Sequence, residues 1–140
     1  MKSDGQIKAD IYRVLKGSAL VAAVSGKLSR RGRPAGSNLE DIVVSVLDNG
    51  SGQIQEAFVN VNIYVPDIQD DTKAYVIHEE RVDELCDMAI DILEVYNGGD
   101  FRFDIVKQRV YSVEGKNEHF INNKLLYKQC NEIVKYLKNY

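Results

Sequence analysis

Alternation of apolar and polar side chains along residues 57–65 is the feature that most constrains how this chain can fold. Successive side chains of a strand point to opposite faces of a sheet, so one face of this segment is purely aliphatic. We expect that face to lie on the core, and it carries Val59, Val61, Ile63 and Val65. The opposite face carries Phe58, Asn60, Asn62 and Tyr64.

A second β-rich run, residues 42–47, precedes this strand, and Asn49-Gly50 lies between the two. Asn-Gly between two β-rich runs is a strong signal for the turn of an antiparallel hairpin. The first run is mostly aliphatic, which is typical of a strand covered on both faces. We therefore predict a hairpin whose first strand lies centrally in the sheet.

Helical periodicity flanks the predicted hairpin. Apolar residues recur every three or four positions from Ser3 or Asp4 to Lys16-Gly17, and a shorter helical piece, residues 19–24, follows Ser18. A second long helix is predicted for residues 80–96, with one apolar stripe and an acidic remainder.

The C-terminal third is predicted to form two more strands, residues 101–113 and 123–131, joined by a turn at 114–117. Residues 132–140 are expected to form a short helix or a frayed end. This order predicts one α+β domain, residues 1–140, with an antiparallel sheet, a long hairpin and two main helices packed on one face.

Charge divides the chain into three parts. Residues 1–35 carry eight Lys or Arg against two acids, residues 36–100 carry two against fifteen, and residues 101–140 carry eight against four. Basic ends around an acidic middle favour contacts between unlike surfaces, within one chain or between copies, although such runs also serve simply as solvated faces.

The composition argues against several classes of protein. We see neither a signal peptide nor a transmembrane segment, and we expect a soluble protein in a cytoplasmic setting. Cys86 and Cys130 are far apart and lack zinc-binding spacing, so we expect reduced, partly buried thiols.

The sequence offers no arrangement of a nucleophile with a base, and His78 and His119 lie outside metal-binding motifs. We therefore predict a protein that is not an enzyme, with no catalytic, cofactor-binding or metal-binding residues. One enzymatic alternative is a cation site on the acidic face of the second long helix; that face is otherwise only solvated, and it comprises Asp83, Asp87, Asp91 and Glu94.

A basic segment between the first helical region and the hairpin suggests another function. Arg31-Gly32-Arg33-Pro34 matches the core of an AT-hook, whose arginines enter the narrow minor groove of A·T-rich DNA. Working hooks usually carry further basic residues after the proline, whereas acids follow here at Glu40 and Asp41. A small DNA-binding protein is thus an alternative, and an exposed loop that contacts a neighbouring protein is the preferred interpretation.

The layout of the chain resembles a known group. An N-terminal helix, a basic stretch ending in Arg33-Pro34, the strand entry Ser37-x-x-Glu40-Asp41-Ile42-Val43-Val44 and the strand Gln55–Val65 occur in sequence, followed by a helix and a final hairpin. Over about residues 5–131, this order resembles the small tail-completion proteins of tailed bacteriophages and prophages, the tail terminator and head-tail joining group.

The resemblance implies a structural role in virion assembly. Such proteins are α+β domains that form rings, commonly hexamers, at the head-proximal end of the tail, where they stop tube growth and dock the head. The implied partners are copies of the chain itself, the tail tube protein and the head-completion or connector protein, with DNA only as passing cargo. We expect assembly in the bacterial cytoplasm and a final place at the head-tail junction. The expected contact residues are Lys27, Arg30, Arg31, Arg33, Glu40 and Asp41.

Overall fold

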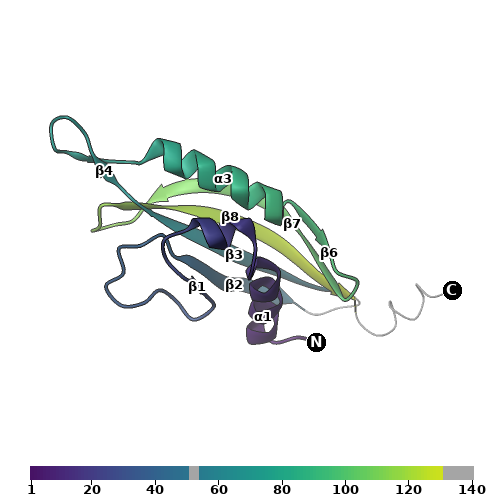
Figure 1. The fold of residues 1–140 in the computed structure, drawn as a ribbon. Helices are drawn as coiled ribbons and strands as arrows, with labels where there is room; N and C mark the ends of the chain where they lie inside the picture. The colour runs from purple at the N-terminus through teal and green to yellow at the C-terminus, as the bar shows by residue number, and fades with distance from the viewer. Residues whose placement is uncertain (51–53, 131–140) are drawn as a thin grey trace.

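The computed structural model describes residues 1–50 and 54–130, which form a mixed α+β fold built on a curled six-stranded sheet (Figure 1). This confirms the predicted fold class at the level of a sheet combined with helices. The described helices are α1 (Asp4–Leu15), α2 (Ala19–Ala23) and α3 (Glu79–Leu93). The strands are β1 (Leu28–Ser29), β2 (Ile42–Gly50), β3 (Ile54–Pro66), β4 (Ile68–Gln69), β5 (Tyr75–Val76), β6 (Val95–Asn97), β7 (Phe101–Ser112) and β8 (Glu118–Cys130).

The strands of the main sheet lie in the order β1-β2-β3-β8-β7-β6. Every neighbouring pair is antiparallel except β1 and β2, which are parallel. The long strands β3 and β8 pair along their whole length, from Ile54 with Cys130 to Pro66 with Glu118. Two distant parts of the sequence therefore form the centre of the sheet.

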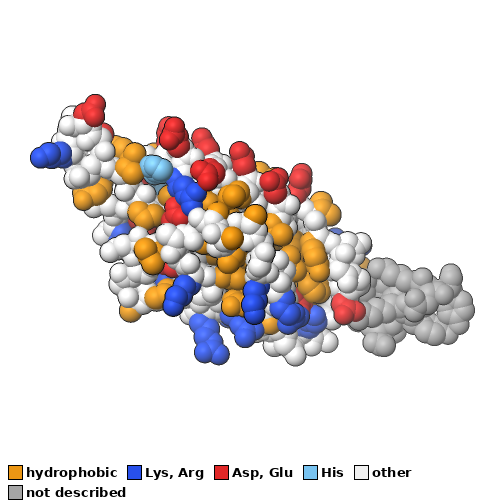
Figure 2. Space-filling view, in the orientation of Figure 1, with side chains coloured by type: hydrophobic (Ala, Val, Ile, Leu, Met, Phe, Trp, Pro, Cys, Tyr) orange, Lys and Arg blue, Asp and Glu red, His pale blue; other side chains and the backbone are white. Residues whose placement is uncertain are grey.

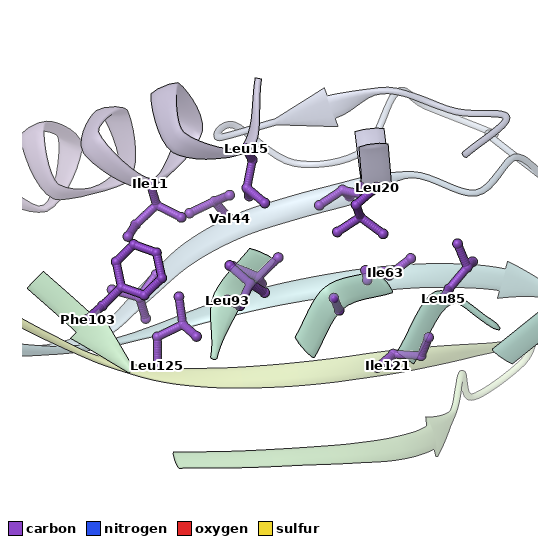
Figure 3. Packing of buried hydrophobic residues seen from close by; sticks show 14 of the residues in the cluster. Ile11, Leu15, Leu20, Val44, Ile63, Leu85, Leu93, Phe103, Ile121 and Leu125 are labelled. Carbon is purple, nitrogen blue, oxygen red and sulfur yellow. The ribbon is translucent and has the colours of Figure 1, made fainter. Parts of the chain in front are cut away.

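The aliphatic face of β3 lies on the core, as the alternation predicted. Val59, Val61 and Ile63 are fully buried, and so is Leu125 on β8. Side chains of α1, α2 and α3 join the same cluster, and Figure 3 shows several of them meeting the sheet residues. The helical members are Ile7, Ile11, Leu15, Leu20, Val82, Leu85, Ala89 and Leu93.

Helix α1 begins and ends where its sequence signals indicate. The Ser3 hydroxyl accepts a hydrogen bond from the backbone N–H of Gln6, and the Gln6 side chain accepts one from the backbone N–H of Ser3. This reciprocal capping satisfies two backbone donors that a helix start otherwise leaves unpaired. Beyond the helix, Gly17 has a φ of 82°, a conformation that glycine adopts at little cost.

The predictions for the first strand of the hairpin were wrong in two respects. Strand β2 is not covered on both sides: its Leu47 side chain is 58% exposed, and the two-residue β1 is its outer neighbour. Asn49 and Gly50 do not form the turn, because they pair with Ala57 and Glu56 as part of the ladder. The run of aliphatic residues reflects β propensity here rather than a central position.

Other boundaries also differ from the prediction. Helix α3 ends at Leu93 instead of residue 96, because residues 95–97 pair with β7 as an added strand. Strand β8 starts at Glu118, five residues early, since its polar residues pair with the end of β3. The small β4–β5 hairpin, which lies between β3 and α3, is not among the predicted elements. The end predicted for residues 132–140 lies outside the described residues.

Candidate functional site

The basic segment, residues 27–34, starts on the sheet and then leaves it. Its first residues form β1, and the Lys27 carbonyl accepts a hydrogen bond of 2.9 Å from the backbone N–H of Ile42. Gly26 lies directly against the acidic pair that follows the segment: a Cβ there would be 2.2 Å from Asp41 Oδ1 and 2.6 Å from the Glu40 carbonyl oxygen. A glycine is therefore required for the chain to close this loop.

Arg33 points into the protein rather than toward solvent. Its Nη1 and Nη2 donate to the two carboxylate oxygens of Glu118, at 2.7 and 2.9 Å, and its Nε donates to Asp41 Oδ2 at 3.0 Å. The guanidinium also lies 4.1 Å from the ring centroid of Tyr64. The contact with Glu118 is bidentate, which is the strongest geometry for an arginine–carboxylate pair.

The carboxylates that surround Arg33 are buried, with Asp41 1% and Glu118 3% exposed. Burial alone would lower the pKa of Arg33, but hydrogen bonds and charge from Glu118 and Asp41 raise it above its ordinary value. Burial would likewise raise the pKa of Asp41, yet hydrogen bonds from Ser37, Lys27 and Arg33 lower it. Arg33 and Asp41 therefore both stay charged at neutral pH, and their contacts hold the loop in place.

Glu40 makes a second internal ion pair. Arg81 on α3 donates from Nε and Nη2 to the two oxygens of Glu40, at 2.7 and 2.8 Å, and from Nη2 to the Ala23 carbonyl at 2.6 Å. The hydrogen bond from Arg81 lowers the pKa of Glu40 against the opposing effect of burial. This pair ties α2, the loop and α3 together.

The six expected contact residues therefore divide into two groups. The side chains of Arg33, Glu40 and Asp41 are engaged inside the chain. Lys27, Arg30 and Arg31 are exposed and form no ion pair with the described residues, although the Arg30 guanidinium lies 5.5 Å from the Tyr12 ring centroid. Of the expected contact residues, only Lys27, Arg30 and Arg31 are therefore cations that a partner could bind. We call these three residues the basic loop.

The acidic residues predicted on the second long helix lie together on its exposed side. Asp83, Asp87, Asp91 and Glu94 are all exposed, and none forms an ion pair within the described chain. Figure 2 shows the resulting row of acidic side chains along α3, with Lys and Arg side chains at the opposite edge of the same view. Among residues 1–50 and 54–130, no three acidic, His or Cys side chains converge as metal ligands.

Sequence reasoning did not foresee the β4–β5 hairpin, which extends from the body next to the start of α3 (Figure 1). It exposes three large apolar side chains, Ile68 at 45%, Tyr75 at 53% and Val76 at 39%. A two-stranded hairpin has little stability of its own in water, and exposed apolar clusters mark contact sites. The β propensity of residues 74–77 was its one signal in the sequence.

No protein-family model matches the chain, and no curated protein matches it with significance. In the part of the chain that the structure describes, no helix has both the length and the apolar character needed to cross a bilayer.

Proposed function

We propose that this chain is a structural protein of the head-tail junction of a tailed phage or prophage, a tail-terminator or tail-completion protein that acts by ring assembly. In this proposal the two main helices cover one face of the sheet, and the long hairpin and the remaining surfaces make the contacts between proteins. Its partners are further copies of the chain, the tail tube and the head connector, with DNA as passing cargo. Assembly takes place in the bacterial cytoplasm.

The observation that carries the proposal is that exposed acidic side chains and exposed basic side chains lie on different sides of the protein. In Figure 2 the acidic side chains along α3 and a group of Lys and Arg side chains lie at opposite edges of the molecule. Asp83, Asp87, Asp91 and Glu94 form no ion pair with the described residues, whereas Glu84 of the same helix pairs with Arg81. Surfaces of opposite charge on opposite sides allow each copy to bind the next one head to tail. Such contacts close into a ring when the rotation between neighbouring copies divides a full turn evenly. The apolar tip of the β4–β5 hairpin gives a further, separate contact.

The DNA-binding alternative receives less support from the geometry. An AT-hook needs both arginines of its core in an extended, free segment, yet Arg33 is bound to Glu118 and Asp41. The basic loop remains exposed, but three cations in a chain with a net charge of −3 supply little affinity for phosphates.

The cation-site alternative also loses support. Asp83 and Asp91 lie eight residues apart on α3, which corresponds to about 12 Å along a helix axis, too far for two ligands of one ion. A divalent site would need ligands from other segments, and among the described residues no three Asp, Glu, His or Cys side chains converge.

Electron microscopy of the purified protein with its cognate tail tubes tests the proposal. We expect density at one end of each tube and an arrest of further tube growth. A protein that neither caps tubes nor binds any tail or connector component would overturn the proposal. Genes for portal, tape-measure and tube proteins beside this gene would give independent support.

A further inference from the structure

The sheet face opposite the core contains a shallow groove of about 400 Å³. Every residue that lines it belongs to one of the four strands β2, β3, β8 and β7, so the groove lies across the middle of the sheet. The lining residues are Leu47, Asn60, Asn62, Lys107, Tyr111, Phe120, Asn122 and Lys124.

The groove presents hydrogen-bond donors and positive charge. Asn122 donates from its side-chain nitrogen to Asn60 Oδ1 at 2.9 Å and to Asn62 Oδ1 at 2.7 Å. The side-chain nitrogens of Asn60 and Asn62 then donate to no group in the described chain, and Lys107 and Lys124 form no ion pair there. No carboxylate lines the groove, so its chemistry suits an anionic ligand rich in acceptors.

We propose that this groove is the docking site for the acidic face of α3 from a second copy of the chain. That face supplies four carboxylates without ion-pair partners among the described residues: Asp83, Asp87, Asp91 and Glu94. Carboxylates four residues apart on a helix are separated by about 6 Å along the axis. The two lysines of the groove, Lys107 of β7 and Lys124 of β8, are direct cross-strand partners. The Cβ atoms of such partners lie about 5 Å apart, which is close to the spacing of the carboxylates.

The two surfaces of one copy cannot meet each other. Helix α3 packs against the core face of its own sheet, where Gln108 of β7 donates to the Cys86 carbonyl at 3.1 Å. The groove lies on the reverse side of the same strands. Each copy therefore offers its helix to one neighbour and its groove to another, which is the head-to-tail contact that builds a ring. This inference rests on the proposed ring assembly and assigns its interface.

The aromatic residues of this face favour a protein partner over a single-stranded nucleic acid. Nucleic-acid-binding sheets stack bases on open aromatic rings. Here Lys124 Nζ lies 4.4 Å from the ring centroid of Phe58, and the Arg33 guanidinium carbon lies 4.1 Å from that of Tyr64. The ring centroids of Tyr64 and Phe120 are 5.5 Å apart. A cation thus covers one face of Phe58 and of Tyr64, and Phe120 lies between the rings of Tyr64 and Tyr111. Tyr111, 41% exposed, is the groove aromatic left most open to a base.

Charge reversal on each surface gives a sharp test. One variant carries Lys107→Glu with Lys124→Glu, and the other carries Asp87→Lys with Asp91→Lys. Sedimentation velocity and chemical crosslinking of the full chain should show oligomers for the wild type and monomers for each variant alone. An equimolar mixture should assemble again, because helix and groove then carry opposite charges at both kinds of contact. Thermal unfolding of each variant establishes that it is folded.

A matched control reverses two cations of the basic loop, Arg30→Glu with Arg31→Glu, and should leave the oligomer intact. Several results would overturn the inference: a wild-type chain that stays monomeric at about millimolar concentration, a mixture that fails to assemble, or a loop variant that alone dissociates. Loss of binding to a labelled single-stranded oligonucleotide in the groove variant, with self-association intact, would assign the groove to nucleic acid instead. Tube capping is measured separately, so a chain that assembles through this contact but does not cap tubes would contradict the proposed function alone.

Discussion

Arg33 and Glu118, 85 positions apart in the sequence, are joined by two parallel hydrogen bonds of 2.7 and 2.9 Å. The pair fastens the segment before β2 to the first residue of β8. It also removes Arg33 from the exposed basic surface that its sequence suggests. The arginine that looks most like a nucleic-acid contact is therefore a structural residue.

Replacing Arg33 by Ala should destabilise the fold strongly. The substitution removes the cation that pairs with Asp41 and leaves Glu118 with Lys116 alone, whose Nζ lies 3.7 Å from Glu118 Oε1. Breaking a buried pair in this way costs about 3–5 kcal/mol. Urea unfolding followed by circular dichroism measures the effect. Arg31→Ala is the matched control, and as an exposed position it should change the unfolding free energy by less than about 0.5 kcal/mol. Equal effects of the two substitutions would contradict the internal role of Arg33.

The same loop should make the fold sensitive to acid. The folded protein holds the pKa of Glu40 below its ordinary 4.5 and that of Asp41 below 3.8, so the unfolded chain binds protons first as pH falls. The stabilisation is fully present above the ordinary values and is lost as pH drops through the lower, folded-state values. Unfolding free energies measured between pH 6 and pH 2.5 should therefore decline with acid. The decline should be shallower in Glu40→Gln, and an unchanged slope would count against the ion pair with Arg81.

Tyr127 and Asp10 connect the centre of the sheet to α1. The Tyr127 hydroxyl donates to Asp10 Oδ2 at 2.6 Å, and both side chains are buried. Burial, together with the hydrogen bond and charge of Asp10, raises the pKa of Tyr127, so the phenol remains a donor at any ordinary pH. Tyr127→Phe should cost about 1–3 kcal/mol, because Asp10 loses a buried partner. A double-mutant cycle with Asp10→Asn should give a coupling energy of about 0.5–3 kcal/mol, and additive effects would contradict the contact.

Cys86 should react slowly with thiol reagents in the folded protein. Burial first, and then the charges of Asp83 and Asp87, raise its pKa to about 11, so little thiolate exists at pH 8. The rate of labelling by a chromogenic disulfide, measured in a Cys130→Ser background, should rise sharply in 6 M urea. Rapid labelling of the native protein at pH 8 would show that the thiol is not protected as described.

Local patterns predicted the elements whose stability is local. The capping signals around α1 and the alternation along β3 were sufficient to predict these two elements, since each signal is a property of neighbouring residues. The pairing of β3 with β8 and the early start of β8 were not predictable in this way. Polar residues such as Asn122 and Glu118 are part of β8 because they pair with residues of β3, which are far away in the sequence.

The candidate site shows the same division. Sequence placed the acidic residues of α3 on one exposed face correctly, because helical spacing fixes which side chains share a face. It could not separate Arg33 from Arg31, two residues apart, since the burial of Glu118 and Asp41 that draws Arg33 inward depends on tertiary structure. The groove on the sheet was equally hidden, because its lysines come from β7 and β8.

The apolar tip of the β4–β5 hairpin should matter for partners and not for folding. Ile68→Ser with Val76→Ser replaces two exposed side chains that contribute nothing to the core, so the unfolding free energy should change by less than about 1 kcal/mol. Under the proposed function, the same variant should bind tail tubes more weakly, because it loses apolar area that a partner would bury. Co-sedimentation with purified tubes measures that loss, with the Arg30→Glu, Arg31→Glu variant run alongside to compare the basic loop. If the hairpin variant binds tubes as well as the wild type does, the tip is not part of the contact surface. If the variant unfolds, the hairpin contributes to the stability of the fold.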